Sequence, residues 1–300
     1  MKAARFSRFG GPEVLEIVEL PDPHPGAGQI RVTVRAAGVT STDWKARKGL
    51  LGGGLPQTLG YEVAGTVDEV GQGVANVALG DRVFGFSDDR AGAAELALLS
   101  HYARIPPSLS FVEAAALPVA VETATRSLDA LGIETGDLLL VNGASGGIGR
   151  AVVQLALVRG ARVIGIAGPT SQGYLRSLGV EPVAYGDGLV ERVRAIVPNG
   201  VDSALDVVGN GILPELIELA GGREHVVTIA DFRGAKQYGV KFSRGEDGRA
   251  LDAIAEIGEL VESGRFSIPV AQTFPLANIA EAHRLGENRD VRGKLVLTVD

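Results

Sequence analysis

Residues 138–150 read Leu138-Leu139-Leu140-Val141-Asn142-Gly143-Ala144-Ser145-Gly146-Gly147-Ile148-Gly149-Arg150, an apolar run that passes directly into a glycine-dense turn. The run predicts a buried strand over 138–142, and the residues after the turn predict a helix over 150–159. A helix start exposes unpaired backbone N–H groups and the positive end of the helix dipole, which together attract a pyrophosphate. Glycines at a spacing of three keep side chains out of that approach. The stretch therefore predicts a dinucleotide-binding turn of the form G-x-x-G-x-x-G, with a purely structural tight turn as the alternative.

The residues expected to border the nucleotide come from this turn and from the ends of two further strands. In the turn they are Asn142, Ala144, Ser145, Gly146, Gly147 and Ile148. The apolar runs 203–207 and 226–229 predict strands of the same parallel sheet, whose ligands lie along the carboxyl ends of the strands. We therefore expect the residues that follow these runs to border the cofactor, namely Val208, Gly209, Ala230 and Asp231.

The composition limits the class of protein. The chain has 300 residues, of which 45% are hydrophobic and 22% charged, which suits a soluble globular protein of two domains. A net charge of −7 argues against a nucleic-acid surface, which would need a basic stripe. The chain has no cysteine, which excludes thiolate metal sites and is compatible with a reducing cytoplasm. We expect neither a secretory signal nor a membrane span, because no run of about 18 apolar residues is present.

The pattern of predicted elements changes near residue 117. Before it, short runs punctuated by glycine and proline predict strands over 30–36, 64–71 and 81–86. After it, strand and helix patterns alternate, which predicts a doubly wound parallel sheet in an α/β protein. The expected strands are 138–142, 162–166, 203–207 and 226–229, and the expected helices are 150–159, 173–177, 189–196, 212–219 and 250–263. A final strand over 294–299 is expected to return to the first domain. The predicted domains are residues 1–116 with 265–300, and residues 117–264.

The end of the second strand of the parallel sheet bears on the choice of cofactor. Units that bind NAD usually carry Asp or Glu there, to hold the ribose 2′-hydroxyl. Here the segment 164–172 contains no carboxylate, and Gly168, Thr170 and Ser171 are the expected cofactor contacts. A carboxylate would repel a 2′-phosphate, so its absence favours NADPH. Arg176 is a further candidate, with a solvated helix residue as the alternative.

Several motifs together resemble the zinc-free quinone oxidoreductase branch, the zeta-crystallin-like branch, of the medium-chain dehydrogenase/reductases. They are Gly10-Gly11-Pro12-Glu13-Val14-Leu15, Ala36-Ala37-Gly38-Val39, Gly60-Tyr61-Glu62-Val63-Ala64-Gly65, Gly80-Asp81-Arg82-Val83, residues 142–149, Tyr174-Leu175-Arg176-Ser177-Leu178-Gly179 and Gly293-Lys294. The resemblance implies a GroES-like β-rich domain and a Rossmann domain. Zinc-dependent relatives carry a cysteine where this chain has Thr40 and a histidine where it has Tyr61. The resemblance therefore implies a reaction without metal.

The resemblance also assigns roles to individual residues. It implies catalytic roles for Lys45, Tyr61 and Thr40. Lys45 is expected to contact the nicotinamide ribose or the substrate carbonyl, and Tyr61 to donate its hydroxyl toward a developing oxyanion. The alternatives are a surface lysine at position 45 and a tyrosine that merely fills the vacated zinc pocket. Asp43 is expected to cap a helix that begins near Trp44. Four further residues are implied to contact the cofactor: Thr123, Tyr185, Phe242 and Lys294.

Two hypotheses for the function remain. The first is an NADPH-dependent enzyme that reduces quinones or α,β-unsaturated carbonyl compounds by hydride transfer, with acyl thioesters as a substrate variant. The second is a nucleotide-binding protein of the same fold with a structural or regulatory role. In either case we expect a cytoplasmic homodimer, with residues 237–242 adding an edge strand across a two-fold axis, and no nucleic-acid or membrane partner.

Overall fold

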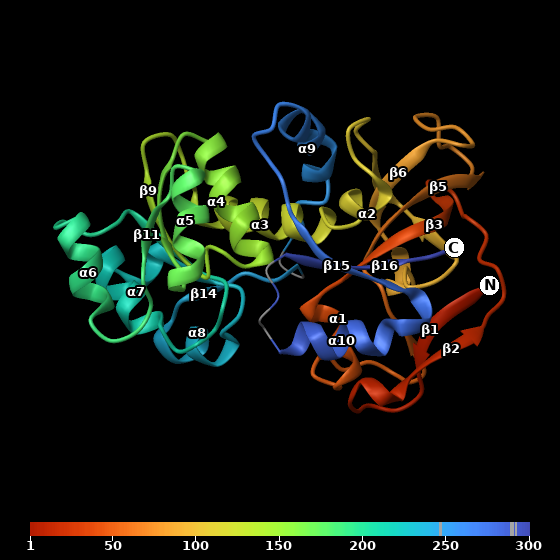
Figure 1. The fold of residues 1–300 in the computed structure, drawn as a ribbon, viewed down its shortest axis with the longest axis horizontal. Helices are drawn as coiled ribbons and strands as arrows, with labels where there is room; N and C mark the ends of the chain where they lie inside the picture. Colours follow the sequence, from red (N-terminus) through yellow and green to blue (C-terminus); the bar gives the residue numbers. More distant parts are fainter. Residues whose placement is uncertain (246–247, 289–290, 292) are drawn as a thin grey trace. The chain divides into compact units, whose positions relative to one another are not determined.

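The computed structural model describes residues 1–245, 248–288, 291 and 293–300 (Figure 1). The chain divides into two compact units. The β-rich unit comprises Met1–Val119, Ile254–Ser263 and Ile268–Asp300, and the parallel-sheet unit comprises Ala120–Ala253 and Gly264–Ser267.

The parallel-sheet unit is built on six strands in the order β11-β10-β9-β12-β13-β14, and every neighbouring pair is parallel. The strands are β9 (Leu138–Asn142), β10 (Arg162–Ile166), β11 (Glu181–Val183), β12 (Ser203–Asp206), β13 (Val226–Thr228) and β14 (Lys241–Phe242). The helices are α3 (Pro118–Leu131), α4 (Gly147–Val158), α5 (Gln172–Ser177), α6 (Leu189–Ile196), α7 (Leu213–Ala220) and α8 (Phe232–Tyr238). The strand order reverses beside β9, which places the glycine turn at the switch point of the sheet.

The apolar runs of this unit form strands because both faces of the sheet are covered. All five residues of β9 are buried, as a strand in the middle of a parallel sheet requires. Leu138 and Leu140 share one core cluster with Leu189 of α6 and with Leu213 of α7. Because side chains alternate along a strand, that cluster lies on one face of the sheet.

The β-rich unit contains a seven-stranded sheet and a three-stranded sheet. The larger sheet has the order β15-β16-β3-β5-β6-β8, with β7 also pairing β3, and the smaller sheet has the order β2-β1-β4. The strands are β1 (Lys2–Phe6), β2 (Leu15–Glu19), β3 (Ile30–Val39), β4 (Gln57–Thr58), β5 (Glu62–Val70), β6 (Arg82–Phe86), β7 (Leu96–Leu99), β8 (His101–Arg104), β15 (Val270–Pro275) and β16 (Lys294–Thr298). The helices are α1 (Ser41–Arg47), α2 (Phe111–Ala114), α9 (Ala253–Glu262) and α10 (Ile279–Glu287).

The last strand closes the β-rich sheet from the far end of the sequence. Strand β16 pairs antiparallel with β3, with Leu295 opposite Val39 and Leu297 opposite Ala37. Leu295 and Leu297 are buried in the same core cluster as the residues of β3. The expected return of the final strand to the first domain is confirmed.

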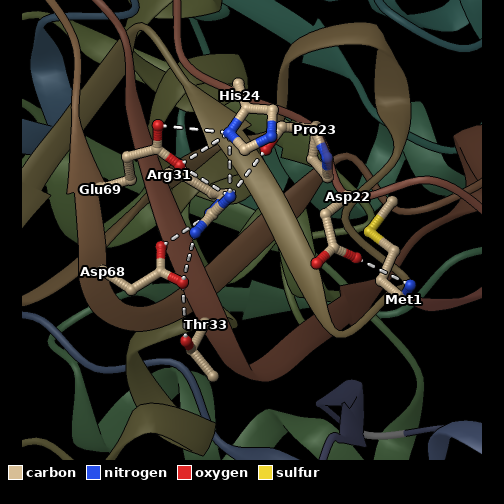
Figure 2. Close-up of polar contacts among 8 residues, drawn as sticks. All are labelled: Met1, Asp22, Pro23, His24, Arg31, Thr33, Asp68 and Glu69. Atoms are coloured by element: carbon tan, nitrogen blue, oxygen red, sulfur yellow. Dashed lines mark hydrogen bonds and ion pairs between the residues drawn. The ribbon is translucent and has the colours of Figure 1, made fainter.

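A polar network fastens the proline-rich segment before β3 to this sheet (Figure 2). The guanidinium of Arg31 donates to both carboxylate oxygens of Asp68, at 3.0 and 3.2 Å, and to the carbonyl oxygen of Pro23 at 3.0 Å. Glu69 lies 2.7 Å from the same guanidinium and 3.0 Å from Nδ1 of His24. These anions raise the pKa of Arg31, chiefly through the hydrogen bond to Asp68. The network fixes the chain where three prolines leave it without N–H donors for a strand.

The predicted fold class is confirmed, and single elements differ from the expectation. Helix α4 begins at Gly147 rather than Arg150, so the glycine turn itself forms its first turn. Strand β11 and helix α8 were not predicted. The stretch expected as an edge strand over 237–242 is interrupted, because Gly239 ends α8 in a left-handed conformation with φ of 70°. Only Lys241–Phe242 form a strand, β14, at the edge of the sheet and parallel to β13.

The predicted domain division differs from the structure at one helix. Helix α9 was expected in the second domain, yet its residues from Ile254 onward belong to the β-rich unit. The backbone N–H and the hydroxyl of Ser108 both donate to Glu262, at 3.1 and 2.7 Å. These contacts tie the end of α9 to the first part of the chain. Over the described residues, no helix has both the length and the apolar character needed to traverse a lipid bilayer.

Candidate functional site

The glycine turn of the parallel-sheet unit is held by backbone hydrogen bonds to the neighbouring strand. The N–H groups of Gly143 and Ala144 donate to the carbonyl oxygen of Ile166, at 3.1 and 3.2 Å. Gly143 has a φ of 85°, a conformation that strains any residue with a Cβ. The first helical hydrogen bond of α4 runs from Arg150 N to the carbonyl oxygen of Gly146 at 2.8 Å. The N–H groups of residues 147–149 precede that bond and point out of the helix start.

Two glycines of this turn have opposite surroundings. A Cβ added at Gly149 would lie 2.0 Å from the carbonyl oxygen of Gly143, so Gly149 is needed for the turn to close. A Cβ added at Gly146 would meet only that same oxygen, at 3.5 Å, so the space in front of Gly146 is open. An open approach to a helix start with unpaired amides suits a diphosphate. The turn therefore fits the cofactor that the sequence predicts.

A buried carboxylate organises the carboxyl ends of β9, β12 and β13. Asp206 Oδ1 accepts the side-chain amide of Asn142 at 2.9 Å and the backbone N–H groups of Val208 and Gly209 at 3.0 Å each. Its Oδ2 accepts the hydroxyl of Thr228 at 2.7 Å. Asp206 and Thr228 are both fully buried. We call Asn142, Asp206 and Thr228 the strand-end network.

The strand-end network shapes the two turns that were predicted to border the cofactor. The hydroxyl oxygen of Thr228 accepts the N–H groups of Ala230 and Asp231, both at 3.1 Å. The predicted residues 208–209 and 230–231 are thus brought together, since a Cβ at Gly209 would lie 2.9 Å from the backbone of Ala230. Sequence reasoning found the turns and missed the residues that hold them, Asp206 and Thr228. A polar residue at the end of each apolar run was the available signal.

The segment after β10 presents hydroxyl groups. Residues 169–171 form the short helix η3, in which Thr170 is exposed and Ser171 is half-buried. The ring of Tyr185 lies over this segment, because a Cβ at Gly168 would be 3.4 Å from it. Tyr185 is 62% exposed, which leaves most of its ring available to a ligand. Gly168, Thr170, Ser171 and Tyr185, all predicted as cofactor contacts, therefore form one surface.

Two other predicted cofactor residues are connected through a buried ion pair. Glu122, on α3, accepts the guanidinium Nε of Arg126 at 2.7 Å and the hydroxyl of its neighbour Thr123 at 3.1 Å. Arg126 in turn donates to the hydroxyl of Ser243 at 2.6 Å. Ser243 directly follows Phe242, whose ring contacts Phe232 at 5.5 Å between centroids. Thr123 and Phe242 are thus held by one chain of polar contacts.

In the β-rich unit, Thr40 and Asp43 form the start of helix α1. The N–H and the hydroxyl of Thr40 donate to Asp43 Oδ2, at 2.7 and 2.8 Å. Asp43 Oδ1 accepts the N–H of Gly60 at 3.2 Å. The helix begins at Ser41 rather than near Trp44, and Asp43 caps it from the third helical position. Burial raises the pKa of the Asp43 carboxyl, opposed by its hydrogen bonds to Thr40.

Lys294 forms a buried ion pair in the same unit. Its ammonium contacts Oε1 of Glu62, which is fully buried, and the backbone N–H of Val119 donates to Oε2 of Glu62 at 2.8 Å. Burial raises the pKa of Glu62, and the positive charge of Lys294 opposes that rise. Lys294 was predicted to contact the cofactor, and the structure gives its ammonium a carboxylate partner within its own unit.

Tyr61 precedes Glu62 and lies between an aromatic ring and a cation. Its ring meets Phe86 edge-on, with 6.0 Å between centroids, and the guanidinium carbon of Arg90 lies 5.7 Å from the Tyr61 centroid. Lys45 is exposed on α1. Thr40, Asp43, Tyr61 and Glu62 are neighbours through the bond from Gly60 to Asp43. Sequence reasoning did not single out Arg90.

Two family models match the chain. One, described as an alcohol dehydrogenase GroES-like domain, matches residues 26–105, and one, described as a zinc-binding dehydrogenase, matches residues 178–297. The quinone oxidoreductase of Rattus norvegicus is 31% identical, over 99% of this chain and 97% of that protein. This chain belongs to the quinone oxidoreductase branch of the medium-chain dehydrogenase/reductase superfamily.

The chain is also similar to part of a longer protein and to a protein whose structure was solved in complex with NADPH. NorB, a spectinabilin polyketide synthase system protein of Streptomyces orinoci, is 34% identical over 98% of this chain, which spans only 14% of NorB. The structure of mycobacterial Rv1454c complexed with NADPH has a TM-score of 0.84 at 26% identity, covering 99% of this chain and 100% of that one. The chain is therefore an oxidoreductase of this superfamily with a nucleotide-binding domain.

The donor groups at the family's zinc positions are unusual for a metal site. This quinone oxidoreductase-branch chain has a hydroxyl at Thr40 and a phenol at Tyr61, where the resemblance puts cysteine and histidine in zinc-dependent relatives. The nearby carboxylates are already engaged, Asp43 by N–H and hydroxyl donors and Glu62 by Lys294. Within the described part of the chain, no group of three or more His, Asp or Glu side chains could hold a metal ion.

Proposed function

We propose that the protein is an NADPH-dependent oxidoreductase that reduces quinones or α,β-unsaturated carbonyl compounds by hydride transfer without a metal ion. The observation that carries the proposal is the start of α4. There, amide groups face the open space in front of Gly146, beside the switch point of a parallel sheet. Unpaired amides at a helix start beside the switch point of a parallel sheet suit the diphosphate of a dinucleotide.

The dinucleotide would be held by residues of the parallel-sheet unit. The N–H groups of residues 147–149 would bind the diphosphate, and the turns at 208–209 and 230–231 would border the remainder, held by the strand-end network. As the resemblance implies, Thr123 would contact the nicotinamide end, and Phe242 would also contact the cofactor. When bound, the cofactor supplies the hydride, and these residues only bind and orient it.

A preference for NADPH over NADH is supported by the segment after β10. Thr170 and Ser171 offer hydroxyl groups to a 2′-phosphate, and the segment 167–172 carries no carboxylate that would repel it. Tyr185, which belongs to the same surface, would contact the adenosine phosphate. The mycobacterial relative complexed with NADPH has the same fold, which agrees with this preference.

The groups proposed to act on the acceptor lie in the β-rich unit. Reduction of an enone or quinone builds negative charge on oxygen, and a hydrogen-bond donor near that oxygen lowers the barrier. Tyr61 and Lys45 would supply such donors. The hydroxyl proton of Thr40 is donated to Asp43, so Thr40 would act by positioning the start of α1. The donor set at positions 40 and 61 supports a reaction without zinc.

The test is NADPH oxidation by the purified protein with a panel of acceptors. The panel should contain quinones, enones and an α,β-unsaturated acyl thioester, the last because of the similarity to a polyketide synthase system protein. We expect turnover with at least one class, a higher kcat/KM with NADPH than with NADH, and no loss after treatment with a chelator. Tight NADPH binding without turnover on any acceptor would favour the nucleotide-binding alternative.

We also propose a homodimer in the cytoplasm. Strand β14 is the edge of the parallel sheet, and Phe232 and Tyr238 of the adjoining helix α8 are 57% and 37% exposed. An edge strand next to exposed aromatic side chains suits pairing with a second copy. The lack of cysteine agrees with a reducing compartment. Light scattering that gives the mass of a monomer would contradict the dimer.

A further inference from the structure

A short kinked turn, η2 (Asp88–Arg90), follows β6 in the β-rich unit. Asp89 and Arg90 have φ values of 55° and 54°, so two consecutive residues with a Cβ adopt the left-handed conformation. Only glycine visits this region without a steric penalty. Strain of this kind persists where the surroundings fix it, and it clusters at functional sites. The kink at Asp89 and Arg90 is therefore expected to hold a side chain in a functional position.

Both sides of the kink are fastened. The N–H of Ser87 donates to the carbonyl oxygen of Tyr61 at 3.0 Å, and the N–H of Ala91 donates to the hydroxyl of Ser87 at 3.0 Å. Asp88 Oδ2 accepts the side chains of Gln29 at 2.7 Å and Ser100 at 2.8 Å. The turn is therefore fixed to neighbours within the β-rich unit on both sides of Asp89 and Arg90.

The fixed turn positions one cation, the guanidinium of Arg90. The guanidinium lies over the ring of Tyr61, which also meets the edge of Phe86. Arg90 is exposed, and the carboxylate of Asp88 is turned to Gln29 and Ser100 instead. Contact with an aromatic ring uses the positive charge of a guanidinium and does not consume its five N–H donors. Arg90 can therefore bind an anion while it lies over the ring.

We propose that Arg90 is a specificity-determining residue, which selects acceptors that carry a carboxylate or another fixed anionic group beside the reducible bond. The inference rests on the proposed function, in which Tyr61 faces the acceptor. The planar guanidinium matches a carboxylate with two parallel hydrogen bonds, which a neutral ester or ketone cannot accept with the same strength. The kink holds the guanidinium next to Tyr61 and so places the anionic group of the acceptor near the proposed donor to its oxygen.

The experiment compares matched charged and neutral acceptors in steady-state assays with saturating NADPH. One pair is trans-benzoylacrylate and its methyl ester, and the second is naphthoquinone sulfonate and naphthoquinone. We expect the wild-type protein to prefer the charged member of each pair. Arg90→Gln should lower kcat/KM for the charged member about tenfold, the loss of a hydrogen-bonded charge pair. The neutral member should lose less, so the ratio of kcat/KM between the charged and the neutral member falls, while KM for NADPH stays unchanged.

Two variants control for charge and for geometry. Arg35→Gln removes the charge of an exposed arginine on β3 of the same unit and should change neither acceptor. Arg90→Lys keeps the charge without the planar donors and should retain part of the preference. Thermal unfolding of all three variants checks that they fold.

The outcomes separate this inference from the function beneath it. A wild-type protein that reduces only the neutral acceptors, or an Arg90→Gln variant that loses equally on both members, overturns the inference and leaves the reductase standing. No turnover with any acceptor overturns both.

Discussion

Two fully buried carboxylates, one in each unit of the molecule, are held in opposite ways. In the parallel-sheet unit, the carboxylate of Asp206 is satisfied by neutral N–H and O–H donors from three strand ends. In the β-rich unit, Glu62 is buried against the charge of Lys294. Neutral donors fix a turn in one geometry, whereas an ion pair leaves a large penalty when one partner is lost. Removal of the charged partner of Glu62 should therefore cost more stability than removal of one neutral donor to Asp206.

Removing the cation of the β-rich unit should have the largest effect. Lys294→Met leaves Glu62 buried without its counter-charge, and we expect the free energy of unfolding to fall by about 3–5 kcal/mol. The variant should regain stability as the pH is lowered. Burial raises the pKa of Glu62, so the folded state then binds a proton more strongly than the unfolded state does. Urea denaturation at several pH values measures both the loss of stability and its recovery at lower pH.

A double substitution and a surface control test that interpretation. Lys294→Met with Glu62→Gln removes the charge as well as its partner, and should recover most of the lost stability. Lys2→Met, at an exposed lysine on β1, should stay within about 0.5 kcal/mol of the wild type. A double variant as unstable as Lys294→Met alone would contradict the assignment of the effect to an unpaired charge.

Two alanine substitutions should separate folding from binding in the glycine turn. In Gly149→Ala the new Cβ overlaps the carbonyl oxygen of Gly143, and we expect a loss of about 3 kcal/mol in stability, with NADPH binding lost as well. In Gly146→Ala the Cβ has room within the protein and projects into the proposed approach of the diphosphate. That variant should keep its melting temperature and lose NADPH affinity. Thermal unfolding and fluorescence titration distinguish the two, and unchanged affinity in Gly146→Ala would count against the site.

Acid should weaken the β-rich unit through a buried histidine. Burial, reinforced by the charge of Arg47, lowers the pKa of His283 to about 3, below its ordinary 6.5. The unfolded state therefore binds the proton first, and stability is lost as the pH falls from 6.5 toward 3. At pH 5 the loss is about 2 kcal/mol. His283→Leu should remove this part of the acid dependence, and equal slopes for both proteins in urea denaturation at pH 7 and 5 would refute it.

A carboxylate after β10 should shift the choice of cofactor. Ser171 precedes α5 and makes no side-chain cap hydrogen bond, so Ser171→Asp removes no cap and adds a negative charge. We expect kcat/KM with NADPH to fall about tenfold while kcat/KM with NADH is unaffected. Ser171→Asn, a similar side chain without charge, is the matched control. If both substitutions changed the ratio of kcat/KM with NADPH to kcat/KM with NADH by the same factor, charge at this position would not be the cause of the cofactor preference.

The smallest expected effect lies in the exposed network around Arg31. Asp68→Asn removes the carboxylate that takes two hydrogen bonds from Arg31, which Glu69 still contacts. Partly exposed pairs contribute little, so we expect a loss of about 0.2–1 kcal/mol, smaller in high salt. Thermal unfolding at two salt concentrations measures it. A loss as large as that of Lys294→Met would remove the distinction between buried and exposed charges in this unit.

The elements that the sequence predicts well are those whose signal is local. Strands β9 and β10 have their predicted bounds because an apolar run ends in glycine or polar residues on each side. Strand β11 has three residues, one of them Pro182, and offers no period to detect. Helix α4 starts within the glycines because backbone geometry, rather than helix propensity, sets its first turn.

The residues of the candidate site show the same difference between local and distant signals. The glycine turn and the hydroxyls after β10 each come from one short stretch of sequence, and both were predicted. The pairing of Glu62 with Lys294 joins positions 232 residues apart, which no spacing rule reaches. Asp206 was missed because a single polar residue at the end of an apolar run resembles the start of a loop. Arg90 was missed because only the kinked backbone brings it to Tyr61.

The place of β16 in the middle of the larger sheet, between β15 and β3, bears on how the chain folds as the ribosome makes it. Residues 120–253 are contiguous, so the nucleotide-binding half can mature as soon as they have emerged. Residues 36–39 of strand β3 have by then waited for β16 through more than two hundred codons, whereas residues 30–33 can already pair with β7. The β-rich half therefore finishes last, and until then its exposed strand edge is the part of the nascent chain most open to chaperones and to aggregation.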